Sequence, residues 1–322
     1  MSTAVKDPSQ TAATAPAKRR KTAQKFNRRE ALAGYLFISP WVIGFCIFTV
    51  ISMSWSLGLS FTNYDLSTNT AAPVGATNYQ LLLTDPKVLK SLVNTFIYAV
   101  LAVPLELTFA LALALLLNGV KKGAGVFRTV YYLPKMTPSV ATASVFLLLL
   151  NGNTGAINKF LGWLGIPGPQ WLVDPTWVKP SIVIMAIWGA AGSMVILLAA
   201  LQSVPRELYE AASTDGANRW QQFYKITLPL ISPTLFFLVI VNTIASLQVF
   251  DQAFLLFYRD QNSTAPDAAL FYGVYLYQQA FQQFNFGLAA AMAWLLFLII
   301  LVITVIQMKL GDKLVFYGGG DK

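Results

Sequence analysis

Histidine is absent from this sequence, and only 11% of its 322 residues are charged. The missing histidine excludes histidine-based acid–base catalysis and histidine-ligated metal sites. The single cysteine, Cys46, lies inside an apolar run and leaves no partner for an internal disulfide. Soluble domains usually carry about a quarter charged residues, whereas 56% of this chain is hydrophobic. This balance indicates a membrane protein.

A Walker-type phosphate loop is also missing, because the nearest approximation, at residues 119–123, lacks the required spacing and the hydroxyl residue. No nucleophile–base pair is recognisable either. We therefore expect a transport component rather than an enzyme. The chain is expected to bind no cofactor itself and to hold no metal.

The formal charge of +9 is concentrated before the first apolar run. This tail is rich in Ala, Thr, Ser, Gln and Pro and lacks periodicity, so residues 1–30 are predicted to be disordered. It is too long for a signal peptide, and the run that follows reaches spanning length. A basic tail beside a span sets orientation and contacts anionic lipid, so we expect membrane lipid and no nucleic acid as its partner.

Six apolar segments reach the roughly 20 residues that span a bilayer. They are Ala33–Leu59, Ser91–Asn118, Phe127–Leu150, Ser181–Leu201, Ile231–Phe250 and Phe286–Met308. The sequence therefore predicts an all-α integral membrane protein with six transmembrane helices, in which residues 31–312 form the membrane domain and residues 313–322 a cytoplasmic tail. The spans at 127–150 and 231–250 are less regular, because both begin near prolines and contain polar residues.

The basic residues indicate which side of the membrane each connection occupies. With six spans and a cytoplasmic N-terminus, seventeen of the 23 Lys and Arg residues fall in cytoplasmic segments and five in outer ones. This asymmetry follows the positive-inside rule, so both termini are predicted to be cytoplasmic. The outer segments are longer and contain Trp163, Trp171 and Trp177, which suit a membrane interface or a protein docking surface.

The inner segment between spans four and five, residues 204–229, has the strongest local pattern. Pro205 suits the start of a helix, where its missing N–H costs nothing. Glu207 and Glu210 would follow in the early helix, where negative charge is favoured by the helix dipole. Ala211 and Ala212 leave room for another surface to approach the backbone closely. Gly216 suits a helix end with positive φ.

A second helix is predicted after Gly216, with Trp220, Phe223 and Tyr224, and Leu228-Pro229 is expected to redirect the chain into span five. A short helix across the membrane face that bears carboxylates and small residues suits a groove in another protein. An ordinary inner loop with an amphipathic helix is the alternative.

This segment resembles the signature E-A-A-x3-G-x9-I-x-L-P of permeases in bacterial binding-protein-dependent ABC importers. All seven positions of the signature match, from Glu210 to Pro229. In that family the segment is a coupling helix that docks into a cleft of the ATPase. The resemblance implies that Glu210 pairs with a basic ATPase residue, that the two alanines allow close docking and that Gly216 makes the turn. It gives as ATPase-coupling residues Glu207, Glu210, Ala211, Ala212, Asp215, Gly216, Ile226, Leu228 and Pro229.

Further stretches are similar to the carbohydrate-uptake branch, of the maltose and glycerol-3-phosphate type. They are residues 33–36 with Pro40-Trp41, residues 60–65, Asn78-Tyr79, Asn94-Thr95 and residues 128–134. Val74-Gly75-Ala76 departs from the more usual Phe-Val-Gly. The resemblance covers nearly all of residues 30–312. It implies a sugar or sugar-like solute, a second homologous permease, two ATPase subunits that carry ATP and Mg, and an extracytoplasmic solute-binding protein, all at a bacterial cytoplasmic (inner) membrane.

Polar residues within the spans are candidates for the solute pathway, because ionisable groups are costly at membrane depth and usually have a function there. Lys135 either extends toward the cytoplasmic interface or meets solute beside a helix broken near Pro134 and Pro138. The remaining candidates, which serve either helix packing or solute binding, are Glu106, Asn242, Gln248, Phe250 and Asp251. An ion-coupled secondary transporter would explain Glu106 and Lys135 better, but it leaves the inner segment unexplained.

Overall fold

The structure is a computed structural model that describes residues 28–65, 70–120, 122–258 and 265–314. The chain divides into two units, Met1–Ser54 and Trp55–Lys322, which are treated separately. Most of the predicted tail at residues 1–30 lies outside the described residues, as does nearly all of the predicted tail at residues 313–322.

The first unit is helical throughout its described part. Helix α1 (Arg28–Phe45) continues through the π-helical η1 (Cys46–Ile51) into α2 (Ser52–Leu59), which crosses the unit boundary. The stretch Ala31–Leu59 is long and apolar enough to cross a membrane, as the predicted first span requires. Its large apolar side chains are exposed in the single chain, so they need lipid or another protein as surroundings.

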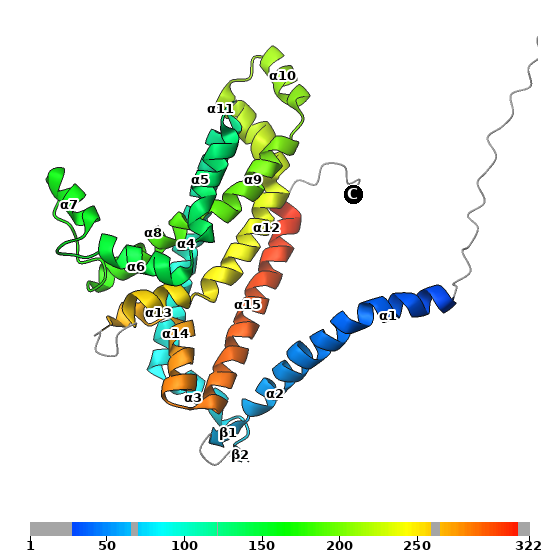
Figure 1. Cartoon of the computed structure of the whole chain (residues 1–322), viewed down its shortest axis with the longest axis vertical. Coiled ribbons are helices and arrows are strands. Elements are labelled where there is room, and N and C mark those ends of the chain that lie inside the picture. Colours follow the sequence, from blue (N-terminus) through cyan, green and yellow to red (C-terminus); the bar gives the residue numbers. More distant parts are fainter. Residues whose placement is uncertain (1–27, 66–69, 121, 259–264, 315–322) are drawn as a thin grey trace, which may run out of the picture. The chain divides into compact units, whose positions relative to one another are not determined.

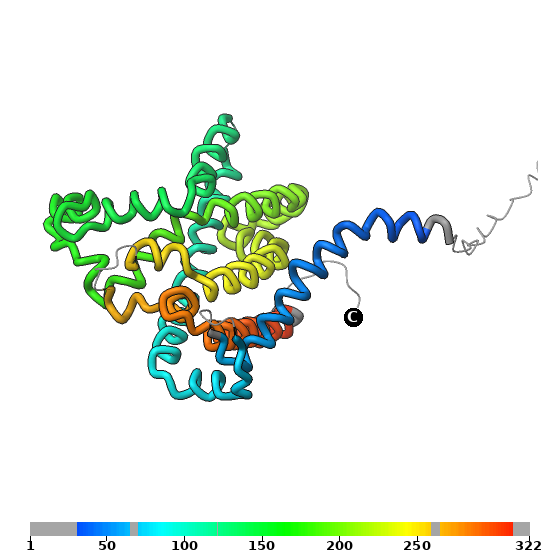
Figure 2. Tube along the Cα trace, turned by 60° about the horizontal axis from the view of Figure 1, so that its bottom comes forward, coloured from blue at the N-terminus to red at the C-terminus, as the bar shows by residue number. Residues whose placement is uncertain are grey.

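The second unit is a helical bundle built around one long helix, α4 (Figures 1 and 2). Its helices are α3 (Thr77–Thr84), α4 (Pro86–Asn118), α5 (Ala124–Met136), α6 (Ser139–Leu149), α7 (Ala156–Trp163), α8 (Pro175–Trp188), α9 (Ala191–Ser203), α10 (Arg206–Thr214), α11 (Arg219–Gln222), η2 (Phe223–Thr227), α12 (Leu228–Leu247), α13 (Asp251–Phe257), η3 (Asp267–Ala269), α14 (Tyr272–Tyr277), η4 (Gln278–Gln282) and α15 (Phe286–Leu314).

Helix α4 occupies the centre because it presents small residues to its neighbours. Ala102, Ala110 and Ala114 are fully buried along it, and α8, α9 and α12 all pack against α4. Small side chains let helix backbones approach closely inside a membrane, where dispersion contacts replace the hydrophobic effect. Met194 and Leu197 of α9 and Ile231 of α12 complete this core.

The predicted spans agree with the described helices in most places. Four described helices are long and apolar enough to cross a membrane, and the pair α8 and α9 makes a fifth candidate with a bend of 49°. The predicted spans at 91–118, 231–250 and 286–308 each lie within one such helix. The span at 181–201 matches the bent pair, which breaks at Gly189 and Ala190.

The segment Phe127–Leu150 is not one helix. Helix α5 ends at Met136 and α6 begins at Ser139. Thr137 between them adopts an extended backbone (φ −77°, ψ 131°), because the ring of the following Pro138 disfavours helical geometry there. The broken helix expected near the two prolines is therefore confirmed, whereas a continuous helix over this range is a wrong prediction.

The all-α prediction needs one correction, because a β-hairpin lies between α2 and α3. Strands β1 (Thr62–Asp65) and β2 (Thr70–Pro73) pair antiparallel. Asn78 Nδ2 donates to the carbonyls of Ser60 and Thr62, at 2.9 and 3.0 Å. A Cβ on Gly287 would lie 1.9 Å from the Thr62 carbonyl oxygen, so only glycine lets α15 begin beside the hairpin. The fold is mostly helical.

A buried hydroxyl joins α14 to the start of α4. Tyr275 Oη donates to Asp85 Oδ2 at 2.5 Å, while Asp85 Oδ1 caps α4 by accepting from the Lys87 N–H at 2.8 Å. Burial of the ring, followed by the hydrogen bond to Asp85 and the charge of that carboxylate, raises the pKa of Tyr275 to about 12 from its ordinary value of 10.0.

This pKa predicts an alkaline loss of stability to which Tyr275 contributes and which Tyr275→Phe reduces. A group whose folded-state pKa is raised stabilises the fold fully below its unfolded value and loses that contribution as pH rises through the folded value. The contribution of Tyr275 is thus complete below pH 10 and disappears toward pH 12. Thermal unfolding of the detergent-solubilised chain at pH 8 and 11 measures it.

We expect Tyr275→Phe to lower the free energy of unfolding by about 1 kcal/mol at pH 8, the usual contribution of one hydrogen bond. The loss of stability between pH 8 and pH 11 should be smaller in this variant than in the wild type. Tyr35→Phe, at an exposed position, is the matched control and should follow the wild type. Equal pH dependence in wild type and Tyr275→Phe would contradict the assignment.

Candidate functional site

Helix α10 is an exposed helix with an acidic first turn. Glu207, Glu210 and Ala211 are exposed to solvent along it, and Ala212 is half-buried. Gly216 has φ +80°, in the left-handed region, and the N–H of Ala217 donates to the carbonyl of Ala212 at 2.8 Å. This i to i+5 bond is the Schellman ending of a helix, which favours glycine. The predicted helix and its turn at Gly216 are therefore confirmed as structure.

Four side chains fasten α10 to the helical segment that follows, through two side-chain hydrogen bonds. Tyr209 Oη is 2.9 Å from Thr227 Oγ1, and Gln222 Nε2 donates to Ser213 Oγ at 2.9 Å and to the Ala217 carbonyl at 3.1 Å. Asn218 and Gln221 form a reciprocal capping box at the start of α11. These residues are not among those predicted above, although Asn-x-x-Gln at the start of a helix is a capping signal that can be recognised in a sequence.

The prediction that Leu228-Pro229 redirects the chain into span five is wrong. Residues 219–247 run without a break through α11, η2 and α12, and Pro229 lies in the first turn of α12. The Leu228 N–H reaches back to the Phe223 carbonyl, an i to i+5 bond of the π-helical η2. A π-bulge accommodates the carbonyl that the proline leaves without its N–H partner. Helices α11, η2 and α12 thus form one helical rod, and the hydrogen bonds described above fasten the separate helix α10 to its first turns (Figure 1).

The nine residues predicted to couple to an ATPase fall into two groups. Glu207, Glu210, Ala211, Ala212, Asp215 and Gly216 lie on or next to α10. Ile226, Leu228 and Pro229 are half-buried in the rod, where Ile226 packs against the bundle core together with Tyr209. The signature therefore combines an exposed helix with the residues that anchor it.

The structure brings Glu106 and Lys135 together, although they are 29 positions apart. Lys135, in the last turn of α5, lies near enough to Glu106 of α4 for their charges to attract each other at a distance longer than a direct ion pair. A Cβ on Gly192 would lie 3.8 Å from Lys135 Cε, so the lysine also reaches the start of α9. The two residues lie on different helices, so the sequence could not predict that they lie near each other.

Asn242 contacts the same end of α9. Its Nδ2 donates to Ser193 Oγ at 3.2 Å and to the Leu238 carbonyl at 2.9 Å. The interhelical bond to Ser193 joins α12 to α9 just after the bend. Lys135 and Asn242 thus both reach the start of α9, at Gly192 and Ser193, and Glu106 lies near Lys135; we call these three residues the α9 cluster.

The other three candidates lie apart from the α9 cluster, where α12 ends and α13 begins. Gln248 and Asp251 are exposed there, while Phe250 between them is half-buried. The Phe250 ring stacks on Phe254, with centroids 5.2 Å apart and planes inclined by 26°. The structure thus divides the six predicted pathway residues into two places along the bundle.

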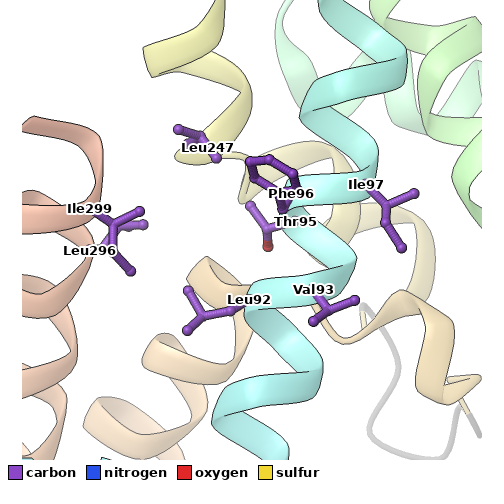
Figure 3. Close-up of a pocket in the computed structure, with 8 residues that line it drawn as sticks. All are labelled: Leu92, Val93, Thr95, Phe96, Ile97, Leu247, Leu296 and Ile299. Carbon is purple, nitrogen blue, oxygen red and sulfur yellow. The ribbon is translucent and has the colours of Figure 1, made fainter. Parts of the chain in front are cut away.

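A pocket of about 260 Å³ lies between α4, α12 and α15 (Figure 3). Its lining residues are almost all apolar: Leu92, Val93, Thr95, Phe96, Ile97, Leu247, Leu296 and Ile299. The Thr95 hydroxyl is occupied, because it donates to the Ser91 carbonyl at 2.8 Å and accepts from the Tyr272 N–H at 2.9 Å. The predicted pathway residues are absent from this lining, and its hydrocarbon surface does not suit a hydroxyl-rich solute.

Several known proteins are similar in sequence to this chain over most of its length. It is 41% identical over 295 residues to the probable ABC transporter permease protein YesP of Bacillus subtilis, covering 90% of this chain and 94% of the relative. It is 32% identical to the arabinooligosaccharides transport system permease protein AraP of Halalkalibacterium halodurans, covering 90% and 92%. It is also 32% identical to the trehalose/maltose transport system permease protein MalF of Thermococcus litoralis, covering 89% and 96%.

Solved structures of an ABC transporter contain chains whose fold is similar to that of this chain. A bacterial ABC transporter involved in the import of the acidic polysaccharide alginate contains a chain that superposes with a TM-score of 0.77 at 27% identity, covering 89% of this chain and 96% of that one. The same transporter in complex with alginate pentasaccharide-bound periplasmic protein gives a TM-score of 0.78. The fold is thus that of an ABC permease.

The helical bundle and exposed inner helix define a multi-pass membrane transport component. Residues 106–315 match the family described as binding-protein-dependent transport system inner membrane component, and the chain belongs to this family. It is therefore an inner-membrane permease subunit of an ABC transporter, a transport component rather than an enzyme. This membership overturns the alternative of an ion-coupled secondary transporter.

Proposed function

We propose that this chain is the permease of a sugar importer and is driven by ATP hydrolysis on separate subunits. The observation that carries the proposal is the exposed helix α10, which bears Glu207 and Glu210 and is fastened to the rod that becomes α12. A push on α10 would pass through its hydrogen bonds to α11 and η2, and then through the continuous helix that leads into α12. This is the property required of a coupling element.

We further propose six spans with both termini in the cytoplasm. In this arrangement the broken pairs α5–α6 and α8–α9 each cross the membrane once, beside the four long apolar helices. Broken helices are tolerated at membrane depth where protein or water surrounds them. The distribution of Lys and Arg supports the orientation, because seventeen of 23 then lie in cytoplasmic segments.

The proposed assembly contains a second homologous permease, two ATPase subunits that bind ATP and Mg, and an extracytoplasmic solute-binding protein. The exposed apolar surface of residues 31–59 supports a further membrane partner or lipid around the first span. The alginate relative, whose structure was solved with its periplasmic protein, supports the binding-protein role. Solute would pass the α9 cluster, where Glu106 and Lys135 flank the bend between α8 and α9.

A sugar or sugar-like solute is proposed because curated relatives are named for arabinooligosaccharides, lactose and trehalose/maltose. Uptake by cells in which this transporter is the sole route tests the proposal. The radiolabelled probes are arabinose, arabinotriose, maltose, maltotriose and an alginate trisaccharide. We expect ATP-dependent uptake of at least one probe and co-purification of an ATPase subunit with the tagged chain. Uptake of no probe would contradict the sugar substrate, and a chain free of ATPase would contradict the coupling role.

A further inference from the structure

Helix α7 is a short helix that is apolar on more than one side. Its eight residues are far too few to cross a membrane. Ile157 and Leu161 pack against the hydrophobic core, whereas Phe160 and Trp163 are exposed on another side of the helix. A helix that is apolar all round is normally surrounded by apolar material. The exposed side of α7 therefore needs a covering that this chain does not supply.

The exposed apolar side chains form a group at the end of α7. Trp163 is 86% exposed, and Phe160, Leu164 and Ile166 are 57%, 60% and 50% exposed. We call these four residues the α7 patch. Helix α7 stands clear of the other helices at one edge of the bundle (Figure 1). The patch is thus presented outward by a projecting element rather than by a membrane span.

A Schellman ending fixes Ile166 beside the helix. The Ile166 N–H donates to the Leu161 carbonyl at 2.9 Å, and the Gly165 N–H donates to the Gly162 carbonyl at 3.0 Å. Gly165 has φ +74°, the left-handed geometry that this motif requires. The chain therefore leaves α7 in a fixed direction, so Ile166 belongs to the patch by the geometry of the helix ending.

Polar contacts hold the segment around α7 together from within. Asn158 Nδ2 donates to the carbonyls of Gly152 and Pro169, at 2.7 and 3.0 Å, and Asn158 Oδ1 accepts from Trp171 Nε1 at 2.7 Å. A Cβ on Gly168 would lie 2.2 Å from Asn158 Cγ, so the segment closes this tightly only with glycine there. These polar groups are thus used inside the segment, while large apolar side chains are held outside it.

The chemistry of the patch fits a phospholipid surface. Protein interfaces carry roughly one hydrogen bond per 100–200 Å², but the patch side chains offer one donor, the indole N–H of Trp163, and no acceptor. Trp is enriched at the headgroup level of membranes, because its ring is apolar and its N–H is polar. Residues 151–173, all described, contain one charged side chain, Lys159, which is exposed. Its ammonium group can extend to a lipid phosphate.

We propose that the α7 patch is a membrane-interface anchor that inserts into the outer phospholipid leaflet. Helix α7 would lie in the plane of the interface, with the patch about 5–10 Å deep between headgroups and acyl chains. Because α7 lies between α6 and α8 in the chain, the anchor would hold the adjoining ends of these helices at a fixed depth. The choice of leaflet rests on the proposed six-span orientation, whereas the anchor itself does not depend on the importer function.

Fluorescence from a single labelled cysteine tests the anchor. In a Cys46→Ser background, which removes the native cysteine, Leu164→Cys carries the environment-sensitive dye NBD within the patch. Gly162→Cys is the matched control, because it lies about 200° round the same helix and a Cβ there meets nothing within 4 Å. The full chain, with the subunits that co-purify, is reconstituted into phosphatidylcholine nanodiscs with and without lipid that is spin-labelled near the headgroup.

We expect the spin-labelled lipid to quench NBD several-fold more strongly at Leu164→Cys than at Gly162→Cys. Adding Phe160→Ser and Trp163→Ser to Leu164→Cys should abolish this quenching. Adding Phe160→Tyr and Trp163→Tyr instead should keep most of it, because tyrosine also suits the interface. Nanodiscs expose both membrane faces, so the readout depends neither on the orientation of the chain nor on transport.

Three results would overturn the anchor. Weak quenching at both labelled positions would show that the patch does not meet lipid, and a blue-shifted but unquenched signal at Leu164→Cys would show that protein covers it. Equally strong quenching at both positions would place the whole helix inside the bilayer rather than at its interface. Equal quenching with the Ser and Tyr pairs would likewise contradict anchoring by these rings.

Discussion

Gly216→Pro and Glu210→Lys are each expected to abolish solute uptake while the chain still reaches the membrane. Gly216 has φ +80°, which proline cannot adopt. The substitution would destroy the helix ending that places α10, although no buried residue of α10 is disturbed. Glu210→Lys reverses an exposed charge on the surface that we propose to contact an ATPase. Uptake and membrane content, measured on the same cells, check both expectations.

Conservative variants at the same positions are the controls. Gly216→Asn should retain most uptake, because asparagine tolerates the left-handed conformation better than other residues. Glu210→Gln removes the charge without reversing it and should fall between wild type and Glu210→Lys. ATPase activity in membranes gives a second readout, since a broken coupling element separates hydrolysis from transport. Normal uptake in both Gly216→Pro and Glu210→Lys would show that the docking role is wrong.

Neutralising either member of the Glu106–Lys135 pair is expected to lower uptake by more than neutralising both. An uncompensated charge at membrane depth costs about 2–3 kcal/mol. Glu106→Gln and Lys135→Gln should therefore each lower uptake on the order of tenfold or more. The double variant removes both charges, so the amount of this variant in the membrane should be much higher than that of either single variant.

The double variant also separates packing from solute transport at this pair. Recovery of both protein and uptake would assign the pair to helix packing, whereas recovery of protein without uptake would assign it to the solute pathway. Lys90→Gln is the matched control, because Lys90 pairs with Asp267 at an exposed position. Such pairs contribute little to stability. Single variants at Glu106 and Lys135 that behave like Lys90→Gln would contradict the proposed pairing.

The pH dependence of the exposed pair differs from that of Tyr275. The hydrogen bond and charge of Lys90 lower the pKa of Asp267. A lowered pKa contributes stability that is present above the unfolded value and lost as pH falls through the folded one. The stability contributed by the Lys90–Asp267 pair is therefore lost below the ordinary aspartate range. The loss above pH 10 comes instead from tyrosines with a raised pKa, Tyr275 together with Tyr258 and Tyr272, whose pKa values burial also raises.

Local sequence was enough to predict the features that depend on neighbours along the chain. Apolar runs of spanning length predicted the helices at 91–118, 231–250 and 286–308. In lipid the backbone N–H and C=O groups have no water to bond, so they must form hydrogen bonds within their own helix. The helix after Pro205 and its turn at Gly216 followed from capping chemistry within twelve residues. Pro134 and Pro138 likewise predicted the break between α5 and α6.

Features that depend on distant segments could not be predicted in the same way. The rod from α11 into α12 required a π-bulge, which no local pattern around Pro229 specified. The β-hairpin depends on Asn78 and Gly287, which meet Thr62 only after folding.

By itself the sequence determined the class of protein, the positions of most spans and the inner helix α10. These properties follow from hydrophobicity, proline and glycine chemistry, and charge placement, all of which act over a few residues. Only the tertiary structure decided that Lys135 lies near Glu106 and that the rings of Phe250, Phe254, Tyr277 and Phe281 contact one another. The physical reason is that pairing across helices depends on packing distances and helix rotation, which arise when small residues such as those of α4 let the helices approach.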